Sequence, residues 1–128
     1  MSRADFQWTQ FRRLLLGTVI EELLKVGAQL EFSSIAIAFD DKSKFQVPRF
    51  NNYMRFVGSL EGVLLAELDD RARGGVERGL LSSWDDILKS VELPVGDNLT
   101  NEKSDVTVTV TGQKGSWRLR VAFDLEAD

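Results

Sequence analysis

The hydrophobic positions at the start of the chain recur every three or four residues. Between residues 4 and 26 they form one apolar stripe, made of Trp8, Phe11, Leu15, Val19, Leu23 and Val26. This spacing places the six side chains on one side of a helix, and the other side carries Arg, Glu and Lys residues. Gly27 follows directly and suits the left-handed residue that often ends a helix. The pattern therefore predicts an amphipathic helix over residues 4–26.

The next hydrophobic segments are shorter and alternate, as strands do. At residues 33–39, Ile35, Ile37 and Phe39 alternate with small residues, which predicts a strand that is covered on both faces. The segments YMRFVGSL and GVLLAELDD, at residues 53–60 and 62–70, predict two more strands. We expect a Gly-containing turn around residues 59–62 to join them as a hairpin.

The middle of the chain has a weaker pattern. The segment RARGGVERG, at residues 71–79, holds three glycines within six residues and predicts a loop. It lacks the lysine that a phosphate-binding P-loop requires. The segment SSWDDILKSVEL then predicts a helix over residues 82–93, because its apolar residues follow helical spacing. Those residues are Trp84, Ile87, Leu88 and Val91.

The end of the chain alternates most regularly. Val and Thr residues take turns over residues 106–111, and after the turn GQKG the alternation continues from Trp117 to Leu125. This pattern predicts a two-stranded hairpin with one apolar and one polar face. The predicted order is therefore α-β-β-β-α-β-β in a single domain, residues 1–128. That order indicates an α+β two-layer sandwich, in which both helices cover one face of an antiparallel five-stranded sheet.

Composition narrows the possible functions. The chain has 128 residues and a formal net charge of −4, which disfavours binding to nucleic acid or to an anionic membrane. It contains neither Cys nor His, which excludes disulfides, Cys/His zinc sites and Ser–His or Cys–His catalysis. Charged residues closely flank the apolar run near the N-terminus, so it resembles neither an export signal nor a membrane span. We therefore expect a cytoplasmic protein.

Carboxylates are the remaining candidates for chemistry. Three Asp pairs, at residues 40–41, 69–70 and 85–86, could be considered as ligands of a divalent metal. Each pair is predicted to end a strand or begin a helix, where Asp commonly supports a turn or a helix start. Glu67 is predicted to lie in a strand without a second carboxylate placed beside it. We therefore expect no enzymatic activity, no metal and no cofactor.

One segment rich in aromatic and cationic residues, KFQVPRFNNYMRF at residues 44–56, is the first candidate for a partner-binding surface. Its proline and two asparagines divide it into an irregular half and a strand. The irregular half holds three side chains that we expect to contact a partner: Phe45, Arg49 and Phe50. In the strand, Arg55 is costly to bury, so we expect Tyr53 and Arg55 to lie on the face opposite to Phe56.

The last hairpin supplies the second candidate surface. Arg118 and Arg120 share one strand face and lie across the hairpin from a row of threonines. This basic and polar surface is either a solvated sheet face with cross-strand pairs or a docking site for a partner. Arg118 and Arg120 therefore join the predicted partner-binding residues.

The element order and two segments resemble the type III secretion chaperones and the related YbjN-like (TY-chaperone) group of bacterial proteins. YMRFVGSLEGVLLAELDD resembles their strand–turn–strand with Glu67 as its acidic end, and LLSSWDDILKSVELP resembles the helix that follows. The resemblance implies a non-catalytic protein that holds an extended segment of a partner, such as a secreted effector, against a sheet edge or an apolar patch. An exposed edge could also pair two copies in a homodimer.

A second class of proteins shares these properties: immunity proteins are also commonly small and acidic and lack cysteine. The alternative function is therefore to neutralise a cognate bacterial toxin by binding its active site with a charged face.

Overall fold

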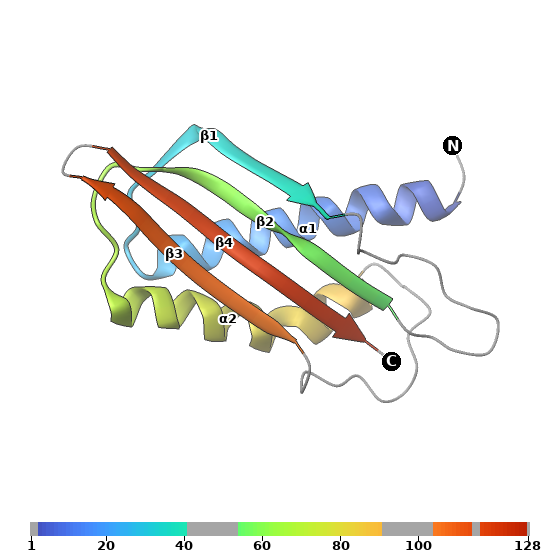
Figure 1. Cartoon of the computed structure of the whole chain (residues 1–128). Helices are drawn as coiled ribbons and strands as arrows, with labels where there is room; N and C mark the ends of the chain where they lie inside the picture. Colours follow the sequence, from blue (N-terminus) through green and yellow to red (C-terminus); the bar gives the residue numbers. More distant parts are fainter. Residues whose placement is uncertain (1–2, 41–53, 91–103, 114–115, 128) are drawn as a thin grey trace.

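The computed structural model describes residues 3–40, 54–90, 104–113 and 116–127. These residues form two helices and four strands (Figure 1). In chain order the elements are α1 (Arg3–Lys25), β1 (Leu30–Phe39), β2 (Met54–Leu64), α2 (Asp70–Ser90), β3 (Asp105–Gln113) and β4 (Ser116–Ala127).

The four strands make one antiparallel sheet in the order β1-β2-β4-β3. Both helices lie on the same side of this sheet (Figure 1). No described helix covers the other face, which we call the open face. The predicted α+β class is confirmed, and so is the final hairpin. The sheet has four described strands, whereas the sequence pattern predicted five.

The difference comes from β2, which is one strand of 11 residues and runs straight through the predicted turn. β2 pairs with β4 without interruption, from the Met54–Ala127 pair to the Leu64–Trp117 pair. Gly58 lies inside this strand, and its neighbours are so close that they leave no room for a side chain. A Cβ at this position would lie 3.0 Å from the Cα of Phe39 and 3.1 Å from the ring of Phe123. Gly58 therefore marks a close approach between neighbouring strands.

The loop predicted for residues 71–79 is also wrong, since this segment is the first half of α2. Asp69 caps the helix, because its Oδ1 accepts a hydrogen bond from the backbone N–H of Ala72 at 2.8 Å. Two of the glycines face α1 instead of breaking the helix. A Cβ at Gly75 would lie 3.3 Å from Val26, and one at Gly79 would collide with the carboxylate of Glu22. The glycines therefore let the two helices pack closely.

This longer helix changes the place of several acidic residues. Glu67 is exposed in the connection between β2 and α2, so the prediction that it lies in a strand is wrong. Asp85 and Asp86 lie in the last third of α2, not at a helix start. Asp69 and Asp70 stand at the start of α2, whereas the sequence pattern predicted that they end a strand.

The core fills the space between the sheet and the helices. The ring of Phe11 stacks on that of Phe56 with centroids 4.2 Å apart, and Trp84 packs edge-on against both rings. Phe56 is fully buried, which confirms its predicted inward orientation. β1 is covered on one face only: Ile37 is buried and Ala38 is exposed, so the prediction of two covered faces is wrong.

The end of α1 agrees with the sequence pattern. Gly27 has a φ of 79°, and its N–H donates to the carbonyl of Leu24 at 3.0 Å. The N–H of Ala28 donates to the carbonyl of Leu23, which completes a Schellman motif. Over its described residues, neither helix is long and apolar enough to cross a membrane.

Candidate functional site on the open face of the sheet

The open face of the sheet carries a row of small side chains across all four strands. The strand pairing places Ala38 beside Ser59, Ser59 beside Ala122, and Ala122 beside Thr107. Successive side chains of a strand point to opposite faces, and most neighbours of these residues along the strands are buried under the helices. The four small side chains therefore form a low strip on the uncovered face.

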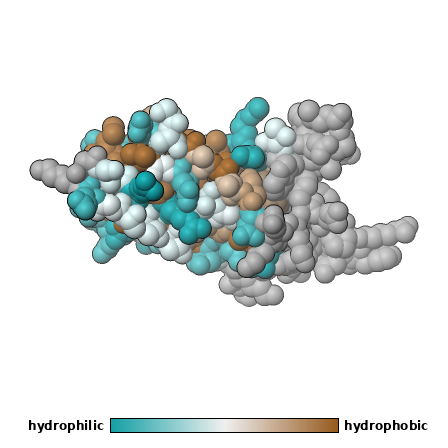
Figure 2. Space-filling model, turned by 45° about the horizontal axis from the view of Figure 1, so that its top comes forward, coloured by the Kyte–Doolittle hydropathy of each residue, from teal (hydrophilic) through white to brown (hydrophobic). Residues whose placement is uncertain are grey.

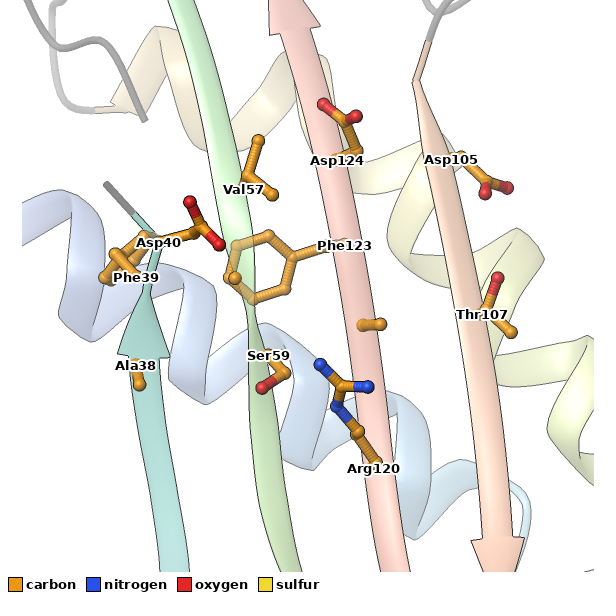
Figure 3. A pocket seen from close by; sticks show the side chains of 12 residues that line it. Ala38, Phe39, Asp40, Val57, Ser59, Asp105, Thr107, Arg120, Phe123 and Asp124 are labelled. Carbon is orange, nitrogen blue, oxygen red and sulfur yellow. The ribbon is translucent and has the colours of Figure 1, made fainter. Parts of the chain in front are cut away.

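A hollow of about 400 Å³ lies over this strip. Charged side chains stand on both sides of it (Figure 3). Asp40, Asp105 and Asp124 lie toward one end, with Val57 between them, and Arg120 lies at the other end. The hollow is thus shallow, with a floor of small residues and a rim of both charges.

Arg55 and Arg120, two of the arginines of this face, differ in how firmly they are held. Arg55 donates two hydrogen bonds to Asp124, from Nε at 2.9 Å and from Nη2 at 2.7 Å. This bidentate pair links β2 to β4 and is half-buried. Arg120 lies 3.7 Å from Glu61, and both side chains are more than 60% exposed (61% and 67%). Such a loose, exposed pair contributes little, so Arg120 can turn to another carboxylate.

Each edge of the sheet is capped by a charged side chain from a helix. On β1, the carbonyl of Ile37 accepts a hydrogen bond from Nη2 of Arg12 at 2.8 Å. On β3, the N–H of Val108 donates to Oε2 of Glu77, also at 2.8 Å. A strand added at either position would have to displace the cap. These contacts hinder pairing with another chain near the end of β1 and in the middle of β3.

The ladder between β1 and β2 is also irregular. Its register shifts between Glu31 and Ala36, and in this stretch the N–H of Val63 donates to the hydroxyl of Ser34 at 2.8 Å. A side-chain oxygen thus replaces a backbone acceptor where the register shifts. Irregularity in an edge strand discourages pairing with a further strand.

Exposed hydrophobic residues lie apart from the hollow. Phe32 is 59% exposed and Leu65 is 63% exposed, and neither residue lines the hollow. Figure 2 shows hydrophilic and hydrophobic residues intermingled on the visible surface of the described part. The open face therefore combines a hollow with charged residues at its rim.

The structure places three of the predicted partner-binding residues. Arg55, Arg118 and Arg120 lie on the open face, and Arg55 is opposite to Phe56, as predicted. Arg120 lines the hollow, whereas Arg55 is engaged with Asp124 beside it. The other four predicted residues lie outside the described residues: Phe45, Arg49, Phe50 and Tyr53.

The carboxylates of the hollow were not predicted to lie together, although Asp40 was considered as one of a pair of metal ligands. Asp40, Asp105 and Asp124 come from three different strands or their ends. A local signal existed, because Asp124 alternates with buried residues of β4 and so had to face outward. Among the described residues, no three metal-ligating side chains come close enough to hold one metal ion.

Comparisons with known proteins give no relative for this chain. No protein-family model matches it, and neither the curated proteins nor the solved structures include a match. The resemblance to secretion chaperones therefore stays a prediction. The function has to be inferred from the residues of the open face.

Proposed function

We propose that this chain is a non-catalytic protein-binding domain that holds a segment of a partner polypeptide across the open face of its sheet. The observation that carries the proposal is the hollow over Ala38, Ser59 and Ala122, with charged residues at its rim. A floor of small side chains lets another chain approach the sheet closely. The charged rim supplies orientation and specificity.

The state of the charged groups favours binding over catalysis. Asp124, between β2 and β3 in the sheet, already accepts two hydrogen bonds from Arg55. A carboxylate that is held in this way supports the sheet and is poorly placed to exchange a proton with a substrate. The chain has no His and no Cys to act as a base or a nucleophile beside it.

The capped edges favour the face over the edge as the binding surface. Strand addition needs a row of available backbone groups, and Arg12 and Glu77 occupy such groups near the end of β1 and in the middle of β3. A partner that lies across the face meets no such obstacle. The proposed job is therefore that of a secretion-chaperone-like holder that uses its sheet face.

The toxin-neutralising alternative uses the same surface. Asp40, Asp105 and Arg120 stand on one face of a sheet, and a fixed pattern of charges suits a complementary active site. The two functions differ in their outcome for the partner. An immunity protein abolishes the activity of its partner, whereas a holder keeps a segment of the partner extended.

Site-specific photo-cross-linking tests the proposed surface. A photoreactive amino acid replaces Ser59 or Ala122 on the open face and, as a control, Ser82, which is exposed on α2. After cross-linking in the native host, the partner is identified by mass spectrometry and purified. We expect this partner to cross-link from Ser59 and Ala122 but not from Ser82.

A steric variant completes the test with the purified partner. Ala122→Arg places a long side chain in the hollow and should abolish binding measured by calorimetry, whereas the matched variant Ser82→Arg should bind normally. Circular dichroism verifies that both variants are folded. Unchanged affinity of Ala122→Arg would refute the open face as the binding surface.

A further inference from the structure

We propose that the cap formed by Glu77 keeps β3 from pairing with β3 of a second copy of this chain. Without this cap, two copies would join their sheets antiparallel around a two-fold axis. The proposal concerns one edge of the sheet and is independent of the proposed function, which uses the open face. It follows from a difference between the two edges.

β3 presents a regular row of backbone groups at the edge of the described sheet (Figure 1). It pairs with β4 in unbroken register over its whole length. The N–H of Val108 points away from β4, since it donates to Glu77 on α2. N–H groups alternate in direction along a strand, so those of Val106 and Val110 point outward as well. An incoming antiparallel strand needs such a row.

The side chains of β3 also favour pairing. Val and Thr alternate over residues 106–111, and both are β-branched residues that suit strands. Residues 106–113 include no charged residue and no proline, and their register with β4 does not shift. Lysines, prolines and bulges are the usual means by which edge strands avoid pairing. This segment lacks all three, so its protection in the described structure depends on the cap from α2.

The opposite edge is protected in more than one way. The register of β1 shifts between Glu31 and Ala36. Arg12 donates to the carbonyl of Ile37, and its guanidinium carbon lies 5.9 Å from the centre of the Phe39 ring, a cation–π contact that helps to hold it there. Loss of one contact would leave β1 irregular, whereas loss of one contact would leave β3 regular and available. We therefore place the second copy at β3.

Glu77 prevents pairing because it occupies the position of an incoming carbonyl group. Its Oε2 lies 2.8 Å from the backbone N of Val108, the usual distance for the oxygen of a neighbouring strand. An incoming carbonyl and the carboxylate are both acceptors, so they cannot bond to each other. Around a two-fold axis, Glu77 of both copies has to be displaced. Removal of the carboxylate therefore favours pairing through both copies at once.

Analytical ultracentrifugation of the full chain over a range of concentrations tests the proposal. Glu77→Ala removes the acceptor, and Glu77→Gln keeps an acceptor oxygen. Asp86→Ala removes the same charge from an exposed position of α2. Glu77→Ala should lower the dissociation constant of the dimer at least about tenfold, because two hydrogen bonds to Glu77 no longer have to be broken. The other two variants should sediment like the wild type.

A second substitution shows whether the association uses β3. Thr109→Lys adds a charged side chain to an exposed position of this strand, and the matched variant Ser82→Lys adds one to α2. In the Glu77→Ala background, Thr109→Lys should restore the sedimentation of the wild type, whereas Ser82→Lys should not.

Hydrogen exchange reports on the same edge at a single amide. In the dilute Glu77→Ala monomer, the amide of Val108 has lost its acceptor and should exchange faster than in the wild type. Its protection should return as the protein concentration rises, because a carbonyl of the second copy replaces Glu77.

Circular dichroism verifies that each variant is folded. Where the alanine variant is unfolded, Glu77→Met replaces it, because methionine keeps an unbranched side chain without a strong acceptor, and the same association is expected. The proposal is overturned if the folded variant without the acceptor associates no more strongly than the wild type. It is also overturned if Glu77→Gln or Asp86→Ala associates equally well, or if Thr109→Lys leaves the association unchanged.

Discussion

Gly79 offers a direct test of the packing between α1 and α2. The glycine lies inside α2, where glycine costs about 1 kcal/mol relative to alanine. Gly79→Ala would therefore stabilise an isolated helix. In this fold, a Cβ at residue 79 would lie 2.5 Å from Cδ and 3.2 Å from Cγ of Glu22. Carbon atoms in contact are normally about 3.5 Å or more apart, so the side chain of Glu22 has to move.

The structure allows the size of the effect to be estimated. Glu22 is 9% exposed and accepts a hydrogen bond from Lys25 at 3.2 Å, so its displacement disturbs a packed contact. Overpacking of this kind costs about 1–3 kcal/mol. After the gain in helix propensity, Gly79→Ala should lower the free energy of unfolding by up to about 2 kcal/mol. In a Glu22→Ala background, Gly79→Ala should raise the free energy of unfolding by about 1 kcal/mol.

A double-mutant cycle measures this coupling. Urea unfolding followed by far-UV circular dichroism gives the free energy of each variant, and unchanged slopes verify that the unfolding reaction stays the same. Gly74→Ala is the matched control on the same helix, because its Cβ would meet only the mobile end of Arg78 at 3.1 Å. Gly74→Ala should stabilise the protein by about 1 kcal/mol both in the wild type and in the Glu22→Ala background. If Gly79→Ala stabilises equally with and without Glu22, the described packing of Glu22 against Gly79 is wrong.

Three further predictions concern the core, the sheet edge and one lysine. Phe56→Ala removes a fully buried ring that is stacked on Phe11 and should cost about 3–5 kcal/mol in urea unfolding; a loss well below this range would contradict its central place. Glu77→Ala removes the acceptor of the Val108 N–H, so hydrogen exchange at that amide should accelerate, whereas Glu77→Gln, which keeps an acceptor oxygen, should preserve protection. The hydrogen bond to Glu22, followed by the charges of Glu22 and Glu21, raises the pKa of Lys25 above its ordinary value. The stability that this contact contributes is fully present below the unfolded-state pKa of Lys25 and is lost as the pH rises through the raised pKa. In the Glu22→Gln variant, NMR titration should show a lower pKa of Lys25 than in the wild type.

The hydrophobic pattern was sufficient to predict the helices and strands that bury one face and expose the other. The stripe of α1 placed Phe11, Leu15, Val19 and Leu23 correctly in the core, and all four are fully buried. The alternation of the last hairpin likewise placed Arg118 and Arg120 on the outer face. These predictions succeeded because helix and strand periods are properties of consecutive residues.

The same local reasoning failed at the glycines. Gly62 was predicted to lie in a hairpin turn and Gly79 in a loop, yet one lies in a central strand and the other in a helix. Gly79 makes room for the side chain of Glu22, which is far away in the sequence. The neighbour that explains a glycine cannot be read from the residues beside it.

The amino-acid sequence by itself determined the α+β class, the extent of α1, the final hairpin and the outward position of three predicted arginines. The tertiary structure alone decided that β4 lies between β2 and β3, which joins Asp40, Asp105 and Asp124 into one row. It also decided that Arg12 and Glu77 cap the sheet edges. The physical reason is that periodicity reports which way a side chain points, whereas strand order and helix placement determine what it meets there.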